Sequence, residues 1–522
     1  MRLSRRSVLS TLAGTAAAAA LSPLSSIVQA SSSEKPSSSK TQDQPLPHDP
    51  LRPAFHYLPT RNWMNDPCAP IFHRGQYHMF HQYNPNAAHW GDMHWAHAVS
   101  PDMVYWRRLP VAIAPTPGGP DSEGVFTGSS ILHNGTPAII YTGVQSVPHD
   151  QATLSDGTHN FRETQLLATA ADRSLGAWRK HPQPVIPSPP PGMKVTGFRD
   201  PAPFEHAGAQ YLAVGSGIAG KGGMVLLYRA VKSPGGAPDL TNWEYLHPLA
   251  EAQRSGNRTS ATDPVDTGEM WECPDFFALG NRHVLIYSTE RKTFWQVGDL
   301  DPQTLRFHPS NSSQLDLGRS FYAPKTQLDA HGNRILWGWL NETRPEAEYT
   351  AAGWSGMLSL PRVLTVEGGV LRMRPLPALR SLREPVANNI LNAESGPNML
   401  LSSGGRISEF TATLQQNARP DIPSAFILSD AAGPLITIRS PAGQQASSAD
   451  FVLPANTQLS RNPTIHVFFD NSVLELFLDN TLCFTKRFYK RDPEQPIATL
   501  ILPGSYTAVE PTTYTLKPIW PA

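Results

Sequence analysis

Apolar residues in this chain gather in short runs that recur at nearly regular intervals. Five such runs have the length of a single strand, at residues 77–83, 138–143, 211–217, 283–289 and 334–340. Successive runs start about 50–75 residues apart, roughly what four short strands and their loops require. A continuous apolar run suits a strand buried on both faces. The repetition predicts five blades around an axis, a β-propeller, with a large irregular sandwich as the alternative.

The pattern changes after the fifth run. A proline-bearing segment, Arg372-Met373-Arg374-Pro375-Leu376-Pro377, reads as a connector. Short apolar runs at residues 465–469, 473–478 and 482–488 then surround the turn Asp479-Asn480, which is typical of antiparallel hairpins in a β-sandwich. We therefore expect an all-β protein. Its predicted parts are a propeller over residues 51–365, a connector over 366–395 and a C-terminal β-sandwich over 396–522.

The first 30 residues have the features of an export signal. An arginine pair, Arg5-Arg6, precedes an Ala/Leu-rich stretch, and Val28-Gln29-Ala30 resembles a cleavage site. These features predict a twin-arginine signal peptide over residues 1–30, with an ordinary secretory signal or a membrane anchor as alternatives. Residues 31–50 are rich in Ser, Lys, Gln and Pro and read as a disordered linker. The protein is thus expected in the periplasm or outside the cell, without a membrane partner after cleavage.

Composition narrows the class of protein further. The 43 basic and 43 acidic side chains give a formal net charge of zero, which provides no electrostatic attraction for nucleic acid. The 51 prolines and the charged fraction of 16% disfavour long helices. The sequence has no metalloprotease histidine frame, nucleophile elbow, phosphate-binding loop or dinucleotide fingerprint. We expect neither a metal nor a cofactor.

Three acidic residues stand in short, unusual frames. They are Asp66 in Trp63-Met64-Asn65-Asp66-Pro67, Asp200 in Phe198-Arg199-Asp200-Pro201, and Glu272 in Trp271-Glu272-Cys273-Pro274. Cleavage of a glycosidic bond needs two carboxyl groups facing each other across the sugar. A third acid is useful where positive charge develops on the ring. The frames predict that the three residues meet in space.

Each acid has an ordinary structural explanation beside the catalytic one. Asp66 could belong to a simple turn, but Trp63 and Met64 would wall a pocket in which a carboxylate can act as a nucleophile. Asp200 could form a surface salt bridge; an ionised Asp200, kept so by the adjacent Arg199, could stabilise an oxocarbenium-like state. Glu272 could face water at a strand end, whereas poorly solvated aromatic surroundings would suit it as the general acid.

Aromatic and amide side chains near the first acid suggest a sugar ligand. Trp90 and Phe126 could pack on the apolar faces of a sugar, and Gln82 could bond its hydroxyl groups. Core packing is the alternative, and it is preferred for Trp95 and Trp106.

The three cysteines, Cys68, Cys273 and Cys483, cannot all be paired in disulfides within one chain. Two of them lie close to candidate catalytic acids, so a disulfide across the site is conceivable. We favour small, buried, unpaired residues.

Taken together, these frames resemble glycoside hydrolase family 32, the β-fructosidases. The resemblance runs from about Phe55 to Tyr514. Besides the three acidic frames, it is carried by Gln82-Tyr83-Asn84-Pro85, Trp90-Gly91-Asp92-Met93-His94-Trp95, Phe126-Thr127-Gly128-Ser129, Phe321-Tyr322-Ala323-Pro324-Lys325-Thr326, Ile335-Leu336-Trp337-Gly338-Trp339 and Leu360-Pro361-Arg362.

The resemblance implies a five-bladed propeller with a C-terminal β-sandwich, and no cofactor. It implies Asp66 as the nucleophile, Glu272 as the acid/base and Asp200 as the transition-state stabiliser. The enzyme would retain configuration through a covalent fructosyl intermediate and release fructose from sucrose or a fructan. Further substrate contacts are expected at Asn65, Gln82, Trp90, Phe126, Thr127 and Arg199.

Two positions depart from the family's usual pattern. Cys68-Ala69 replaces Asn-Gly after the first proline, and Thr127 replaces Ser after Phe126. Both bear on substrate preference more than on activity. A fructosyltransferase would carry the same three acids, and a non-catalytic sugar-binding protein on the same scaffold is the alternative outside enzymes.

Overall fold

The computed structural model describes residues 49–133, 135–155, 160–252 and 264–384 of the N-terminal part. In the C-terminal part it describes residues 398–402, 407–416, 425–430, 433–439, 450–452, 459–489, 497–501 and 506–520. The predicted signal peptide and nearly all of the predicted linker lie outside the described residues.

Five antiparallel sheets follow one another along the chain. The first contains β1 (Asn62–His73), β2 (Gln76–Asn84), β3 (His94–Ser100) and β4 (Arg107–Ile113), and the second β5 (Gly124–His133), β6 (Thr136–Ser146), β7 (Phe161–Ala170) and β8 (Trp178–Lys180). The third contains β9 (Phe198–His206), β10 (Ala209–Ile218), β11 (Gly222–Lys232) and β12 (Pro238–Glu251), and the fourth β13 (Glu272–Leu279), β14 (Arg282–Thr289), β15 (Lys292–Leu300) and β16 (Phe307–Gln314). The fifth contains β17 (Phe321–Leu328), β18 (Arg334–Leu340), β21 (Arg362–Glu367) and β22 (Val370–Pro375), with β20 (Met357–Leu358) beside β18.

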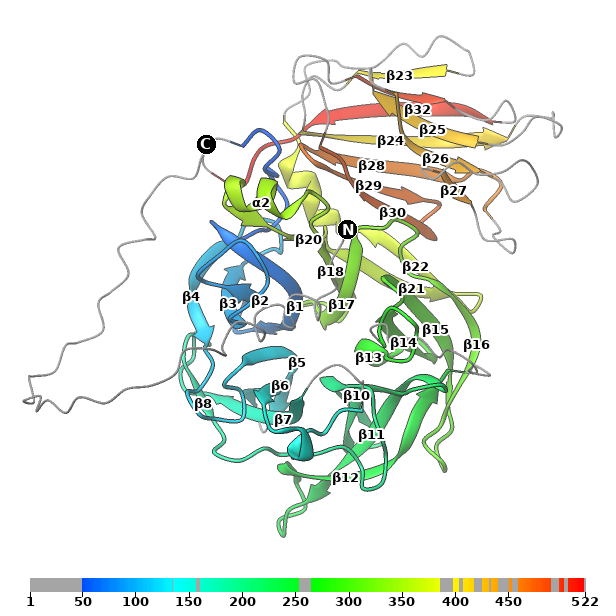
Figure 1. The fold of residues 1–522 in the computed structure, drawn as a ribbon. Coiled ribbons are helices and arrows are strands. Elements are labelled where there is room, and N and C mark those ends of the chain that lie inside the picture. The colour runs from blue at the N-terminus through cyan, green and yellow to red at the C-terminus, as the bar shows by residue number, and fades with distance from the viewer. Residues whose placement is uncertain are drawn as a thin grey trace, which may run out of the picture.

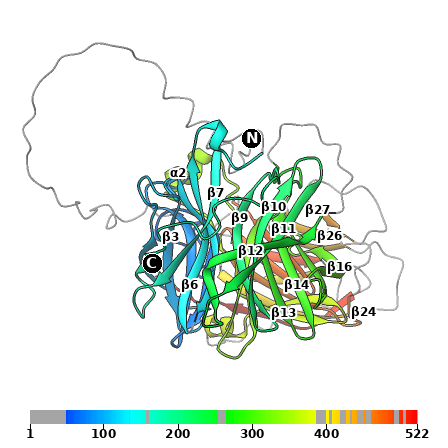
Figure 2. The same ribbon diagram turned by 90° about the horizontal axis from the view of Figure 1, so that it is seen from below.

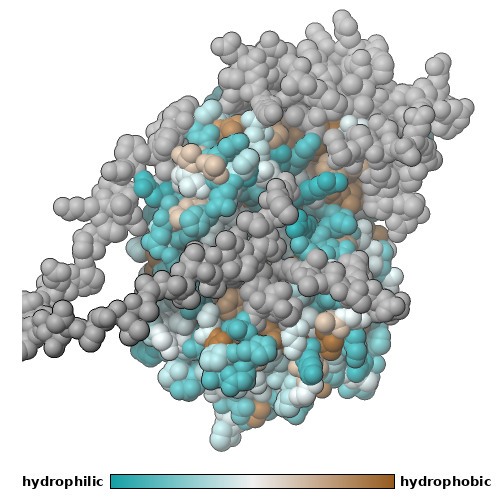
Figure 3. All heavy atoms as spheres, in the orientation of Figure 1, coloured by the Kyte–Doolittle hydropathy of each residue, from teal (hydrophilic) through white to brown (hydrophobic). Residues whose placement is uncertain are grey.

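The five apolar runs of the sequence are the second strands of these sheets, namely β2, β6, β10, β14 and β18. A second strand is paired along both edges, and neighbouring sheets cover both of its faces, so nearly every side chain in it is buried. The five-bladed propeller predicted from this pattern is confirmed. On the face seen in Figure 3, the described surface is mostly hydrophilic, with small, separate hydrophobic areas.

The first strands form a closed ring at the centre of the propeller. Contacts run from β1 to β5, β9, β13 and β17 and then back to β1. Figure 1 looks down this ring, and Figure 2 shows the blades from below. The ring is closed by β19 (Trp354–Ser355), which follows the short helix α2 (Glu346–Ala352) and pairs in parallel with the start of β1. The fifth sheet continues to Pro375 and so enters the segment that the sequence assigned to the connector.

Two five-stranded sheets form the C-terminal sandwich, which lies beside the propeller (Figure 1). One contains β23 (Asn398–Ser402), β25 (Ala425–Asp430), β26 (Gly433–Arg439), β27 (Asp450–Val452) and β31 (Ile497–Ile501). The other contains β24 (Ile407–Gln416), β28 (Thr464–Asp470), β29 (Val473–Leu478), β30 (Leu482–Arg487) and β32 (Tyr506–Thr515). The predicted hairpins around Asp479-Asn480 are present as β28, β29 and β30. Two short 3₁₀ helices, η1 (His149–Gln151) and η2 (Pro377–Leu382), complete the described elements.

A β-bulge interrupts the first strand of every blade near its start. The pairing register shifts after Met64 in β1, after Val125 in β5, after Arg199 in β9, after Glu272 in β13 and after Tyr322 in β17. A bulge re-aims the side chains that it carries. The same local irregularity therefore turns one or two residues of each first strand out of the regular pleat, at the same end of the ring.

Local sequence explains the bulges. A proline lies in or directly after four of them, and proline is tolerated there because it cannot donate a ladder hydrogen bond. The fifth bulge has Gly128 instead. A Cβ atom on Gly128 would lie 2.2 Å from the carbonyl oxygen of Ile140, so only glycine fits at this approach of β5 to β6.

A buried ionic network joins the propeller to the sandwich. The Arg362 guanidinium lies 2.8 Å from carboxylate oxygens of both Asp316 and Glu475. The other oxygen of Glu475 lies 3.1 Å from His56, whose second ring nitrogen is 2.8 Å from Asp470. All five side chains are fully buried. Because removal of one partner would leave uncompensated charge in the interior, the two domains are expected to unfold together.

We expect stability to fall on the alkaline side because of His56. Burial alone would lower the pKa of His56, but hydrogen bonds to Asp470 and Glu475 outweigh it and raise the pKa from 6.5 to about 9. The stabilising contribution is complete below the unfolded-state value of 6.5 and is lost as the pH rises through about 9. Denaturant titrations across this range should show a loss on the order of 3 kcal/mol in the wild type, given the size of the shift. A His56→Gln variant with the same loss would contradict this assignment.

Candidate active site

The three predicted acids come together at the starts of three first strands. Asp66 lies in β1, Asp200 in β9 and Glu272 at the beginning of β13. The thiol of Cys273 lies 3.4 Å from an oxygen of Asp66 and 3.4 Å from an oxygen of Asp200, so it joins these two carboxyl groups. Glu272 is the residue before Cys273. All three acids are buried at one end of the ring, with exposed fractions of 0% for Asp66, 2% for Asp200 and 4% for Glu272.

Polar side chains fix the Asp66 carboxylate on both oxygens. Asn65 donates to Oδ1 over 3.1 Å, and the Thr127 hydroxyl donates to Oδ2 over 2.5 Å. The amide of Gln82 connects these two neighbours, since it accepts from Asn65 over 2.7 Å and donates to Thr127 over 2.5 Å. The indole of Trp63 donates to Asn65 over 2.8 Å. Three residues predicted to contact substrate, Asn65, Gln82 and Thr127, thus surround Asp66.

Thr127→Val should impair catalysis without removing a catalytic group. Valine preserves the shape of threonine but deletes the hydroxyl that donates to Asp66. A hydrogen bond to a charged group contributes about 1.5–3 kcal/mol, so kcat/KM should fall about 10- to 100-fold. Thr127→Ser, which keeps the hydroxyl, is the matched control. Wild-type kcat/KM in Thr127→Val would contradict the role of this hydrogen bond, and a loss in Thr127→Ser alone would show that packing of the methyl group is responsible instead.

Asp200 has a left-handed backbone conformation (φ 64°) inside its bulge. Its Oδ2 accepts from the backbone amide of Cys273 over 2.8 Å, and its own amide donates to the Thr142 hydroxyl over 2.9 Å. Arg199 favours the ionised form of Asp200, as expected, but other groups act in the opposite direction. Burial and the carboxylates of Glu272 and Asp66 outweigh the arginine, so the pKa of Asp200 lies above its usual value.

Arg199 instead pairs with two glutamates. Its Nη2 and Nε atoms donate to Oε1 of Glu272 over 2.9 and 3.2 Å, and Nη1 donates to Oε1 of Glu163 over 3.1 Å. The other oxygen of Glu272 accepts from the Tyr322 hydroxyl over 2.8 Å. Glu272 is therefore poorly solvated, as predicted, but its hydrogen-bond partners are a guanidinium and a phenol, whereas the ring of Trp271 stacks on Tyr287.

Aromatic side chains gather next to the acids. Trp90 and Phe126 meet edge to face with ring centroids 6.0 Å apart, in one apolar cluster with Trp63, Tyr322 and Cys273. Their roles as substrate contacts stay predictions. By contrast, Trp95 and Trp106 are buried in core clusters, as expected.

The cysteines are free and buried, which confirms the favoured interpretation. Burial, followed by the charge of Asp66, raises the pKa of Cys68 well above its usual value, so this thiol stays protonated. Ala69, which takes the place of the family's usual glycine, has a φ of 43°. An alanine in this left-handed region is strained by about 1–2 kcal/mol relative to its preferred conformations.

Three residues of the site were not predicted as site residues from the sequence, Thr142, Glu163 and Tyr322. Tyr322 precedes Ala323-Pro324, the fifth blade's version of the proline bulge, so the repeated proline could have revealed it. Glu163, Thr164 and Gln165 are three consecutive buried polar residues at the start of β7, which is unusual in a buried strand. That polar run before the apolar half of the strand was the available signal.

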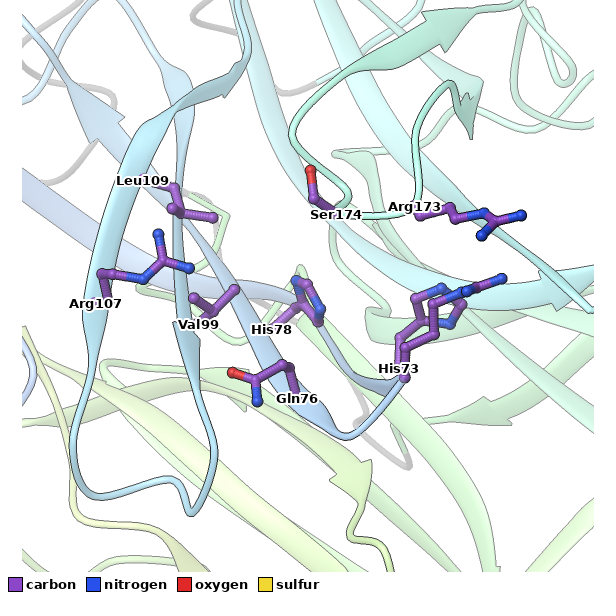
Figure 4. A pocket seen from close by; sticks show the side chains of 9 residues that line it. His73, Gln76, His78, Val99, Arg107, Leu109, Arg173 and Ser174 are labelled. Atoms are coloured by element: carbon purple, nitrogen blue, oxygen red, sulfur yellow. The ribbon is translucent and has the colours of Figure 1, made fainter.

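A separate cavity of about 300 Å³ lies at the other end of β1 (Figure 4). His73, Arg74, Gln76, His78, Val99, Arg107, Leu109, Arg173 and Ser174 line it. No carboxylate is among these residues, so this cavity has none of the chemistry described above. Within the described residues, no cluster of three or more potential metal ligands occurs, and no helix is long and apolar enough to cross a membrane.

Comparison with known proteins identifies the family of this chain. Residues 56–375 match the model of the glycosyl hydrolases family 32 N-terminal domain, which is more than half of the chain. The chain belongs to glycoside hydrolase family 32. The matched span begins just before β1 and ends with β22, so it covers the five blades of the family 32 propeller and all three acids.

Similar proteins include sucrose-6-phosphate hydrolase of Escherichia coli, 36% identical over an alignment of 351 residues that covers 64% of this chain and 66% of that protein. A cell wall β-fructofuranosidase of Zea mays is 34% identical over 64% of this chain and 56% of that protein. The chain thus spans less than two thirds of either relative. Among solved structures, fructan 1-exohydrolase IIa of Cichorium intybus superposes with a TM-score of 0.70 and 26% identity, over 90% of this chain and 98% of that one.

Proposed function

We propose that this protein is a retaining β-fructosidase that releases fructose from sucrose or a β-fructan. The observation that carries the proposal is the meeting of Asp66, Asp200 and Glu272 at one end of the propeller, with Cys273 between the first two and Arg199 on the third. Relatives named for sucrose 6-phosphate and for β-fructofuranoside hydrolysis support a fructosyl substrate.

The proposed reaction has two steps. The Asp66 carboxylate attacks the anomeric carbon of the fructosyl unit while the bond to the leaving oxygen breaks and Glu272 gives that oxygen a proton. Water then attacks the same carbon, Glu272 takes the proton from it, and Asp66 is released with retention of configuration. Asp200 accepts hydrogen bonds from sugar hydroxyls as positive charge develops on the ring.

A panel of sucrose, sucrose 6-phosphate, raffinose, levan and inulin tests the proposal, with products followed over time by chromatography. Free fructose should accumulate from at least one of these sugars, and early products should retain the β configuration by NMR. Trisaccharides at high sucrose would identify a fructosyltransferase. Binding of sucrose without any product would identify a non-catalytic protein. The Glu272→Ala variant should lose several orders of magnitude in kcat.

We also propose export through the twin-arginine route. The support is the Arg5-Arg6 pair before the Ala/Leu-rich stretch. Replacement of both arginines by lysine should leave the protein inside the producing cell, as measured by fractionation. Unchanged export of that variant would point to a different route.

A further inference from the structure

Glu163 is a buried carboxylate, outside the three proposed catalytic acids, that contacts the arginine paired with Glu272. It lies in β7, in the second blade, and is 2% exposed. Its two oxygens lie 3.1 and 3.4 Å from Nη1 of Arg199, and Oε2 also accepts from the backbone amide of Phe198 over 2.6 Å. Arg199 lies in β9 and Glu272 in β13, so a line of three charged side chains crosses three blades.

Side chains of β7 fix the backbone directly before Arg199. Gln165, two residues further along β7, points to the same side and donates to the carbonyl oxygen of Phe198 over 2.9 Å. These two side chains hold both backbone groups of Phe198, directly before Arg199. Gly197 adds to the fit, because a Cβ atom there would lie 2.7 Å from Nη1 of Arg199. The Arg199 guanidinium is thus confined by its close approach to the backbone at Gly197 and by its contact with the Glu163 carboxylate.

Charged and titratable groups surround Glu272 from several elements. The charged side chains are Arg199 and Asp200 from β9, Glu163 from β7, Asp66 from β1 and Lys325 from β17; the titratable donors are Cys273 from β13 and Tyr322 from β17. Arg199 is the nearest cation, with its donors on the Glu272 carboxylate. A lone arginine at this distance would favour the ionised carboxylate and oppose the protonated form that a general acid needs.

We propose that Glu163 is a positioning residue that holds Arg199 against Glu272 and, by sharing the arginine's charge, lets Glu272 carry a proton in the working pH range. The inference rests on the proposed function, because it gives Glu272 the acid/base role. Beyond that role, Glu163 would help to set the pH range in which Glu272 works, although it lies in a different blade. The positive charge of the Arg199 guanidinium is thus shared between the carboxylates of Glu163 and Glu272.

The test is the pH dependence of kcat/KM for Glu163→Gln with the best substrate of the panel. Glutamine keeps the size of the side chain and an oxygen for the Phe198 amide, but it removes the negative charge. Arg199 then acts on Glu272 alone, so the basic limb of the profile should move to lower pH by about one unit. On that limb, kcat/KM should fall about tenfold at a fixed pH.

Two controls separate this effect from a general loss of stability. Glu163→Asp keeps the charge and should leave the basic limb within about 0.3 unit of the wild type, far less than one neighbouring charge is worth. Glu409→Gln removes another buried glutamate that pairs with an arginine, Arg383, in the sandwich, and should leave the profile unchanged. A basic limb that stays in place or moves to higher pH in folded Glu163→Gln would overturn the proposal.

A second variant covers the case in which Glu163→Gln does not fold. Glu163→Gln combined with Arg199→Met removes both buried charges. The basic limb of this double variant should lie at or above that of the wild type, and a limb at lower pH would overturn the proposal. The Glu272→Ala variant separates a failure of the proposed function from a failure of the role given to Glu163. If it stays active, the proposed function fails; if it is inactive while Glu163→Gln has a wild-type profile, only the role of Glu163 fails.

Discussion

Asp66→Ala is expected to lower kcat by at least about 10⁴-fold while leaving a folded protein. Loss of a covalent nucleophile has effects of this order, because the remaining groups can bind the sugar but cannot form the intermediate. Of the acids that the structure describes beside Asp66, neither Asp200 nor Glu272 is free to take its place. Asp200 accepts from the backbone of Cys273, and Glu272 is held by Arg199 and Tyr322. Steady-state kinetics with the preferred sugar, together with circular dichroism, measure the effect.

Asp470→Asn is the matched control for this experiment. Asp470 is as buried as Asp66, but it lies in β28 of the sandwich and accepts from the amides of residues 54–56. Its replacement should reduce stability and leave kcat unchanged. Turnover near the wild-type value in folded Asp66→Ala would refute the role of Asp66, whatever the sandwich variant does.

Arg362→Met is expected to destabilise the protein by about 3–5 kcal/mol, the usual result of removing one partner of a buried ion pair. Methionine fills much of the space between the rings of Phe321 and Phe477, on which the guanidinium lies. The loss is thus electrostatic, because Asp316 and Glu475 would lose the guanidinium that they share, and only His56 would remain beside Glu475. Denaturant unfolding monitored by fluorescence and by residual activity measures it.

Arg383→Met provides the comparison for Arg362→Met. Arg383 forms an equally short pair with Glu409, but its side chain is 22% exposed, so solvent can compensate part of the change. We expect a loss of about 1 kcal/mol. If Arg362→Met costs no more than this, the network does not couple the two domains, and activity should then be lost at a different denaturant concentration from the fluorescence change.

The fold could be predicted because its signal is repeated. Each second strand is covered on both faces, so each leaves a continuous apolar run, and five runs give five blades. The hairpins of the sandwich were equally visible, because residues 464–487 alternate apolar strands with tight turns. The fifth sheet extends beyond its predicted end because β22 follows a short hairpin turn at Gly368-Gly369, whereas its prolines suggested a connector.

The partners within the site were less accessible to sequence reasoning. The frames around Asp66, Asp200 and Glu272 marked three acids that the structure brings together, since aromatic and proline neighbours are local features. The partner of Arg199 was misassigned, because the bulge in β9 turns its side chain toward the adjacent blades. Glu163 is 36 residues from Arg199 in sequence, and the residues next to each of them do not predict their contact. Contacts between blades depend on bulge geometry, which a linear pattern does not encode.

The closing strand β19 has a consequence for biosynthesis. Its residues pair with the start of the strand that carries Asp66, and a Cβ atom on the following Gly356 would lie 2.1 Å from the carbonyl oxygen of Met64. In a nascent chain that has not yet emerged as far as residue 356, Asn62 and Trp63 at the start of this strand therefore lack their partners Trp354 and Ser355. We expect the growing polypeptide to remain catalytically silent, and dependent on chaperones, until translation of the blades is nearly complete.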